Sequence, residues 1–207
     1  MRSFDYRASN IDKLRRLLRS RRPSERKLRL FMVACCQLDR TAITYSDGLA
    51  LVALAEHQAD AEVTADELAK ARKIVHRWCR KQPAITGPWP ERDKRWVGLW
   101  GPYQSATDTP TKPPYGFLND PDYRPVLADI LGPPSKSVAF PPAWRTDTVV
   151  PLARTMYESR DFSAMPILAD ALEDAGCDHA DILDHCRDTA LAHVRGCWVV
   201  DLVLGKE

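Results

Sequence analysis

Apolar residues recur at helical spacing along most of this chain. Over residues 10–20, leucine and isoleucine return every three or four positions with arginines between them, which predicts an amphipathic helix. A last helix is predicted to begin between Thr189 and His193 and to end at Gly205. Similar patterns predict the helices between these two, over 25–39, 48–59, 64–81, 122–131, 147–158, 163–175 and 179–187.

Evidence for β-strands is slight. The best candidates, 136–140 and 198–204, are short, and the second fits a helix equally well. The pattern therefore predicts an all-α fold, either a multi-helix bundle or a short array of helical hairpins with an inserted loop.

Several predicted helix ends carry residues that satisfy unpaired backbone groups. Thr64 followed by Glu67 has the spacing of a capping box, and Ser24 can cap the helix over 25–39. Gly176 directly follows the helix over 163–175, where a left-handed residue commonly ends a helix. These signals fix the predicted boundaries more firmly than periodicity alone.

Residues 83–118 interrupt the helical pattern. They are rich in proline, have no helical period and carry three tryptophans, Trp89, Trp96 and Trp100. A structureless segment of this length is uncommon inside a compact domain, so we interpret it as an inserted loop whose tryptophans pack on the body or on a partner. We therefore predict one structural domain with a basic N-terminal helical half (1–82), this loop (83–118) and an acidic C-terminal helical half (119–207).

Charge is distributed unevenly between the two ends. The formal net charge is only +2, yet residues 1–29 carry eleven Arg or Lys against three Asp or Glu, and residues 158–207 carry four against eleven. The opposite ends can attract each other within one fold or between the copies of a homo-oligomer, and the basic end can also meet an external anion.

The six cysteines are expected to be reduced. The N-terminal sequence MRSFDYRASN lacks the apolar stretch of a secretory signal, and no run of about 18 apolar residues predicts a membrane span. We therefore expect a cytoplasmic protein with free thiols and no membrane partner.

Three cysteines and three of the five histidines gather in residues 163–205. His193 and Cys197 are four positions apart, which places both side chains on one face of the predicted last helix. Together with Cys177 and Cys186 they could hold a zinc ion in a tetrahedral site of three thiolates and one imidazole, with His185 as a competing ligand.

Two other interpretations of these cysteines stay open. Cysteine is among the most buried residue types, so the thiols could serve only as small apolar side chains, and no cofactor is then needed. Cys197 could instead be a nucleophile with His193 and Asp201 one turn away on either side.

The basic N-terminal segment is a candidate binding surface. Arginine dominates lysine there, and a guanidinium suits contact with phosphate. The candidate residues are Arg15, Arg16, Arg19, Arg21 and Arg22. The loop over 83–118 also mixes aromatic and basic residues, as single-strand binders do. A solvated basic surface and a packed loop explain the same residues without a nucleic acid.

The C-terminal segments PILADALEDAGC, DILDHCR and HVRGCWVVDLVLGK resemble the signature of a large paralogous family of uncharacterised bacterial proteins. RKLRLFMVACCQLDR at 26–40, EHQADAEVTADELAKAR at 56–72 and FPPAWRTDTVV at 140–150 are also similar to that family. The resemblance covers about two thirds of the chain and leaves out 83–118. It implies no activity, cofactor or catalytic residue.

These observations favour a non-enzymatic adaptor or accessory module. The sequence has no Gly-rich phosphate loop, no GxSxG and no HExxH motif. We expect a protein partner that docks on Trp89, Trp96 and Trp100 and on the charged ends. The alternatives are an accessory protein that binds nucleic acid through its basic N-terminal helices, and a structural zinc-binding protein.

Overall fold

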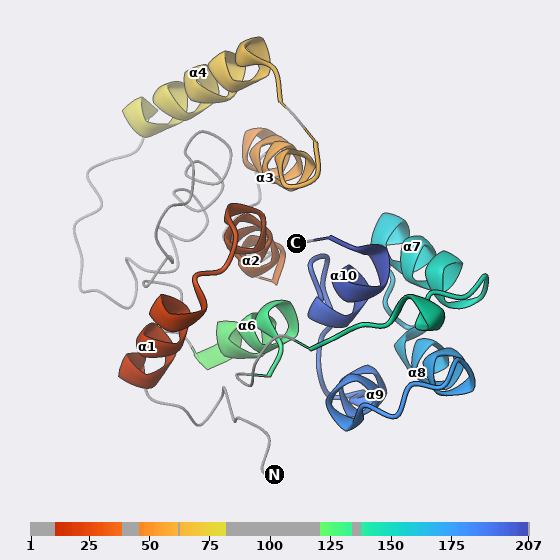
Figure 1. Cartoon of the computed structure of the whole chain (residues 1–207). Coiled ribbons are helices and arrows are strands. Elements are labelled where there is room, and N and C mark those ends of the chain that lie inside the picture. The colour runs from red at the N-terminus through yellow and green to blue at the C-terminus, as the bar shows by residue number, and fades with distance from the viewer. Residues whose placement is uncertain (1–10, 39–45, 62, 82–120, 134–137, 207) are drawn as a thin grey trace. The chain divides into compact units, whose positions relative to one another are not determined.

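The structure is a computed structural model that describes residues 11–38, 46–61, 63–81, 121–133 and 138–206 (Figure 1). Every regular element in these ranges is a helix, so the predicted all-α fold is confirmed. The chain divides into two compact units, one over Ile11–Tyr123 and one that contains Arg124–Glu207. The loop predicted over 83–118 lies outside the described residues.

The first unit contains α1 (Ile11–Arg21), α2 (Glu25–Leu38), α3 (Ser46–Gln58) and α4 (Ala65–Lys81), followed by a 3-10 turn at Pro121–Tyr123. Helix α2 is its centre, because all nine residues from Leu28 to Cys36 are buried. Its residues Val33 and Cys36 pack with Leu51, Val52 and Ala55 of α3 and with Ala71 of α4.

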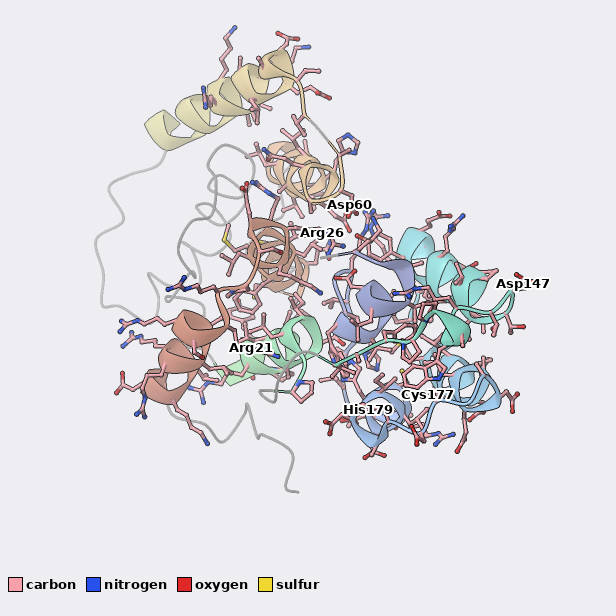
Figure 2. The ribbon with its side chains drawn as sticks, viewed as in Figure 1. Arg21, Arg26, Asp60, Asp147, Cys177 and His179 are labelled. Atoms are coloured by element: carbon pink, nitrogen blue, oxygen red, sulfur yellow. The ribbon has the colours of Figure 1, made fainter. Side chains whose placement is uncertain are left out.

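Polar contacts reinforce the pairing of α2 with α3. The Arg26 guanidinium lies 3.0 Å from the Asp60 carboxylate just beyond α3 (Figure 2). Arg29 is buried, and it donates hydrogen bonds to Gln58 and to Glu25. A buried guanidinium needs such acceptors, since burial of an unpaired charge costs several kcal/mol, on the order of 3–5.

The second unit contains α6 (Arg124–Leu131), a 3-10 turn at Pro142–Trp144, α7 (Val149–Ser159), α8 (Met165–Asp174), α9 (Ala180–Arg187) and α10 (Trp198–Leu204). Helices α8 and α9 form a hairpin, and α10 packs against α7. Helix α10 is mostly buried, and its apolar residues are joined in one core by Met165, Leu168 and Leu172 of α8 and by Ile182 of α9.

The predicted caps are present. The Thr64 hydroxyl accepts the Glu67 backbone N–H, and the Glu67 carboxylate accepts the Thr64 backbone N–H, as a capping box requires. Ser24 caps α2 by accepting the N–H of Lys27. Gly176 follows α8 at φ 87°, and the N–H of Cys177 bonds to the carbonyl of Leu172.

The beginning of the last helix differs from the prediction. Helix α10 begins at Trp198, not between Thr189 and His193, and the residues from Asp188 to Cys197 form turns and irregular backbone. The strand candidate over 198–204 is this helix. Arg145 supports its C-terminal end by donating to the carbonyls of Leu202 and Val203.

Gly132 ends α6 in the left-handed region at φ 68°, where a Cβ would lie 2.7 Å from ring carbons of Trp198. Gly132→Ala should therefore lower the free energy of unfolding by about 1–2 kcal/mol for the backbone and roughly 1–3 more for the clash. Urea unfolding of this variant measures the sum of the two contributions.

Gly176→Ala is the matched control, because Gly176 also has a positive φ but nothing within 4 Å of the added carbon. It should show the backbone cost alone. Equal losses in the two variants would mean that the close approach of Trp198 to the end of α6 is wrong.

Candidate metal centre

The carboxylate of Asp129 is fully buried inside the second unit. Asp129 lies on α6 beside Leu127 and Ile130, which are also buried. Its Oδ2 accepts the backbone N–H of Val194 at 2.8 Å, and its Oδ1 faces two imidazoles. One acidic side chain thus connects α6 to a segment more than 60 residues later in the chain.

Two histidines meet Asp129 Oδ1 from different elements. His193 Nδ1 lies 2.8 Å from it and comes from the segment that joins α9 to α10. His185 Nε2 lies 3.1 Å from the same oxygen and comes from α9. Both rings are largely buried, with side-chain exposures of 6% and 11%. They contact each other edge to face, with centroids 4.9 Å apart.

Cys197, the residue that precedes α10, is the fourth member of the group. Its thiol is buried, with Sγ 3.3 Å from His185 Nε2 and 4.0 Å from His193 Nδ1. One donor atom from each of the four side chains lies within 4.8 Å of all the others. The oxygen, the two nitrogens and the sulfur therefore converge on one small volume.

The charges in this group depend on one another. Burial by itself raises the pKa of the Asp129 carboxyl, but hydrogen bonds from His185 and His193 and their positive charge outweigh burial and hold the pKa below its ordinary value. Burial, followed by the charge of Asp129, raises the pKa of the Cys197 thiol well above its ordinary value. Asp129 is therefore the anion of the group.

This geometry is not that of a catalytic triad. In a triad, one imidazole nitrogen faces the carboxylate and the other faces the nucleophile. Here His185 uses Nε2 toward both Asp129 and Cys197, and His193 uses Nδ1 toward both. Asp201, the acid proposed from the sequence, is not part of the group. A shared ion requires that one nitrogen of each imidazole lies close to the other ligand atoms, and His185 and His193 meet this requirement.

The structure brings together two of the four metal ligands proposed from the sequence, His193 and Cys197, together with the competing ligand His185. Their proximity does not come from a shared helix face, since both precede α10 in irregular backbone. The fourth member, Asp129, was missed. The only signal for it was an aspartate between Leu127 and Ile130 in a predicted helix, where a charge is costly.

Cys177 and Cys186 lie in the apolar core of the second unit and are not members of the group. Burial raises the pKa of the Cys186 thiol to about 12 and also raises the pKa of Cys177. Cys177 and His179 lie in the segment that joins α8 to α9 (Figure 2). Both thiols fit the interpretation of cysteine as a small buried side chain.

The candidate partner-binding residues fall in two places. Trp89, Trp96 and Trp100 lie outside the described residues. The arginine candidates, which are Arg15, Arg16, Arg19, Arg21 and Arg22, lie on α1 and at its C-terminal end in the first unit.

Comparisons of this chain with models of protein families, with curated proteins and with solved structures find no match. The family resemblance at the C-terminal end therefore stays a prediction. Within the described ranges, no helix has the length and apolar character needed to cross a membrane.

Asp129→Asn should destabilise the second unit strongly. The variant removes the anion that both imidazoles face and puts an amide nitrogen against groups that donate hydrogen bonds, so we expect a loss of roughly 3–5 kcal/mol in the free energy of unfolding. Asp170→Asn is the matched control, since Asp170 is exposed and pairs with Arg187 on the surface. That change should cost less than about 1 kcal/mol, and similar losses in both variants would contradict a structural role for Asp129.

Proposed function

We propose that this chain is a non-enzymatic helical module whose second unit is held together by one zinc ion bound to Asp129, His185, His193 and Cys197. The observation that carries the proposal is the convergence of one oxygen, two nitrogens and one sulfur within 4.8 Å in a buried place. The four residues come from α6, from α9 and from the segment between α9 and α10, so a shared ion would crosslink three parts of the unit.

The donor set suits zinc better than other common ions. Zinc accepts sulfur, nitrogen and oxygen ligands together and takes four of them in tetrahedral geometry, whereas magnesium and calcium prefer oxygen alone. The Asp129 Oδ2 is engaged by the N–H of Val194, which leaves Oδ1 to bind the metal as a single donor. Four protein ligands and little exposure are typical of a structural zinc site.

Charge balance supports a divalent ion. A carboxylate and a thiolate carry two negative charges, the two imidazoles are neutral ligands, and a divalent cation brings the buried group to zero. Without a cation, Cys197 stays a protonated thiol because burial opposes its ionisation. A neutral centre avoids the cost of leaving a charge in the apolar core.

Bond lengths to zinc of about 2.0–2.3 Å place tetrahedral ligand atoms roughly 3.3–3.6 Å apart. His193 Nδ1 and Asp129 Oδ1 are 2.8 Å apart, so they would separate by about 0.5 Å as zinc replaces the hydrogen between them. His185 Nε2 and Cys197 Sγ, at 3.3 Å, already lie near that separation. His193 Nδ1 and Cys197 Sγ, at 4.0 Å, would instead have to approach each other by about 0.4 Å, so binding requires small shifts of side chains in both directions.

The arrangement also argues against the interpretation of Cys197 as a nucleophile. A nucleophilic cysteine needs access to its substrate and a lowered pKa, whereas Cys197 is buried and its pKa is raised. The adaptor role with a protein partner on Trp89, Trp96 and Trp100 stays a prediction and is compatible with a structural ion in the second unit.

The test is metal analysis of chain purified without chelators, with Cys197→Ser as the variant and Cys186→Ser as the control. Cys186 is a buried cysteine of the same unit that lies outside the donor set. We expect about one zinc per chain in the unchanged protein and in Cys186→Ser, and near zero in Cys197→Ser, because a serine hydroxyl is a poor zinc ligand.

Cobalt(II) titration provides a second measurement that does not depend on whether Cys197→Ser folds. The unchanged chain should develop visible bands of tetrahedral cobalt together with a thiolate-to-cobalt charge-transfer band, and Cys186→Ser should keep both. A chain that contains no zinc and develops no such bands would rule out the proposal, as would equal metal content in the two serine variants.

A further inference from the structure

Helix α1 presents arginines that have no acidic partner. Leu14 and Leu18 are buried and mark one side of α1. Arg16 and Arg19 of α1 and Arg22, which directly follows the helix, are exposed and are here called the arginine face. In the part of the chain that the structure describes, no carboxylate pairs with these three guanidiniums, and Arg16 donates only to the backbone carbonyl of Asp12.

Several other cations of the described residues are paired. Arg15 lies 3.4 Å from the Asp12 carboxylate, Lys70 lies 2.8 Å from Asp66, and Arg187 pairs with both Asp170 and Glu173. The arginine face therefore keeps an uncompensated positive charge. Basic residues near a helix C-terminus interact favourably with the helix dipole, but this effect is confined to the last turn. Arg16 lies before the last turn, so the dipole does not explain its position.

We propose that the arginine face binds the phosphate backbone of a nucleic acid without reading its sequence. Arg16 and Arg19 are three positions apart on α1, which spaces their side chains about 5–6 Å apart along the helix, and Arg22 follows directly after the helix end with φ 46°. Phosphates recur about every 3.4 Å of axis on each strand of a duplex, so guanidiniums at the spacing of Arg16 and Arg19 can each reach a phosphate of one strand. Guanidinium groups also match phosphate oxygens in geometry.

Two other anionic partners fit less well. A membrane surface would need an apolar helix face to insert, and the apolar residues Leu14 and Leu18 of α1 are buried. An acidic protein surface would gain only about 0–1 kcal/mol from each exposed ion pair. A nucleic acid binds through the release of condensed counterions, which makes charge alone sufficient for weak binding.

Binding of the full chain to a short labelled DNA duplex, followed by fluorescence anisotropy over a range of salt concentrations, tests the proposal. The triple variant R16Q/R19Q/R22Q should bind more weakly and reduce the slope of log K against log salt by about 2.7, that is 0.9 for each lost phosphate contact. The triple variant R16K/R19K/R22K keeps the charge and should keep most of the slope.

The control removes the same charge from another helix of the same unit. Lys70, Arg72 and Lys73 are exposed on α4, and K70Q/R72Q/K73Q should leave the slope nearly unchanged. Equal losses in both glutamine variants would overturn the proposal, because net charge alone would then explain binding. No binding of the unchanged chain at about 50 mM salt would also overturn it.

Vesicles that contain an anionic phospholipid provide the second arm of the test. Tighter binding to these vesicles than to the duplex, lost in R16Q/R19Q/R22Q, would assign the arginine face to a membrane surface and overturn the proposal. The zinc proposal is unaffected by any of these outcomes, since its ligands lie in the other unit.

Discussion

The second unit depends on one buried carboxylate. Asp129 has no access to water, and it survives as an anion because two imidazoles and one backbone N–H face its oxygens. These contacts join α6, α9 and the segment from Asp188 to Cys197 at Asp129, although that segment has no regular structure of its own. A helix then begins directly at Trp198, whose neighbours Val199 and Val200 are fully buried. The polar group and the apolar core therefore fix each other.

A divalent cation would resolve the conflict that this group contains. A buried carboxylate beside a buried thiol is favourable only while the thiol stays protonated, as the raised pKa of Cys197 indicates. An ion that binds both, with His185 and His193, would replace several hydrogen bonds by a neutral coordination sphere. Stability would then come from metal affinity as much as from burial, in the manner of small zinc domains. The thiols of Cys177 and Cys186 need no such partner, because they are neutral and lie among apolar side chains.

The sequence predicted the helices well because local chemistry marks their ends. The Thr64 and Glu67 box, Ser24 and Gly176 all act where their types and spacing indicate. The predicted start of α10 was wrong, because the spacing of His193 and Cys197 fits a helix as well as a turn. His193 and Cys197 were predicted as ligands and His185 as a competing ligand, but Asp129 was not, since 64 positions separate it from His193. Long-range contacts of this kind follow from packing and leave only a costly charge in an apolar helix as their trace.

The most direct test of the account is X-ray absorption at the zinc edge of the native protein. A centre built from Asp129, His185, His193 and Cys197 should show one sulfur at about 2.3 Å and three nitrogen or oxygen ligands at about 2.0–2.2 Å. A spectrum with three sulfur ligands would point to Cys177, Cys186 and Cys197 instead and would contradict the geometry of the buried group. Absence of zinc from the native protein would contradict the central claim altogether.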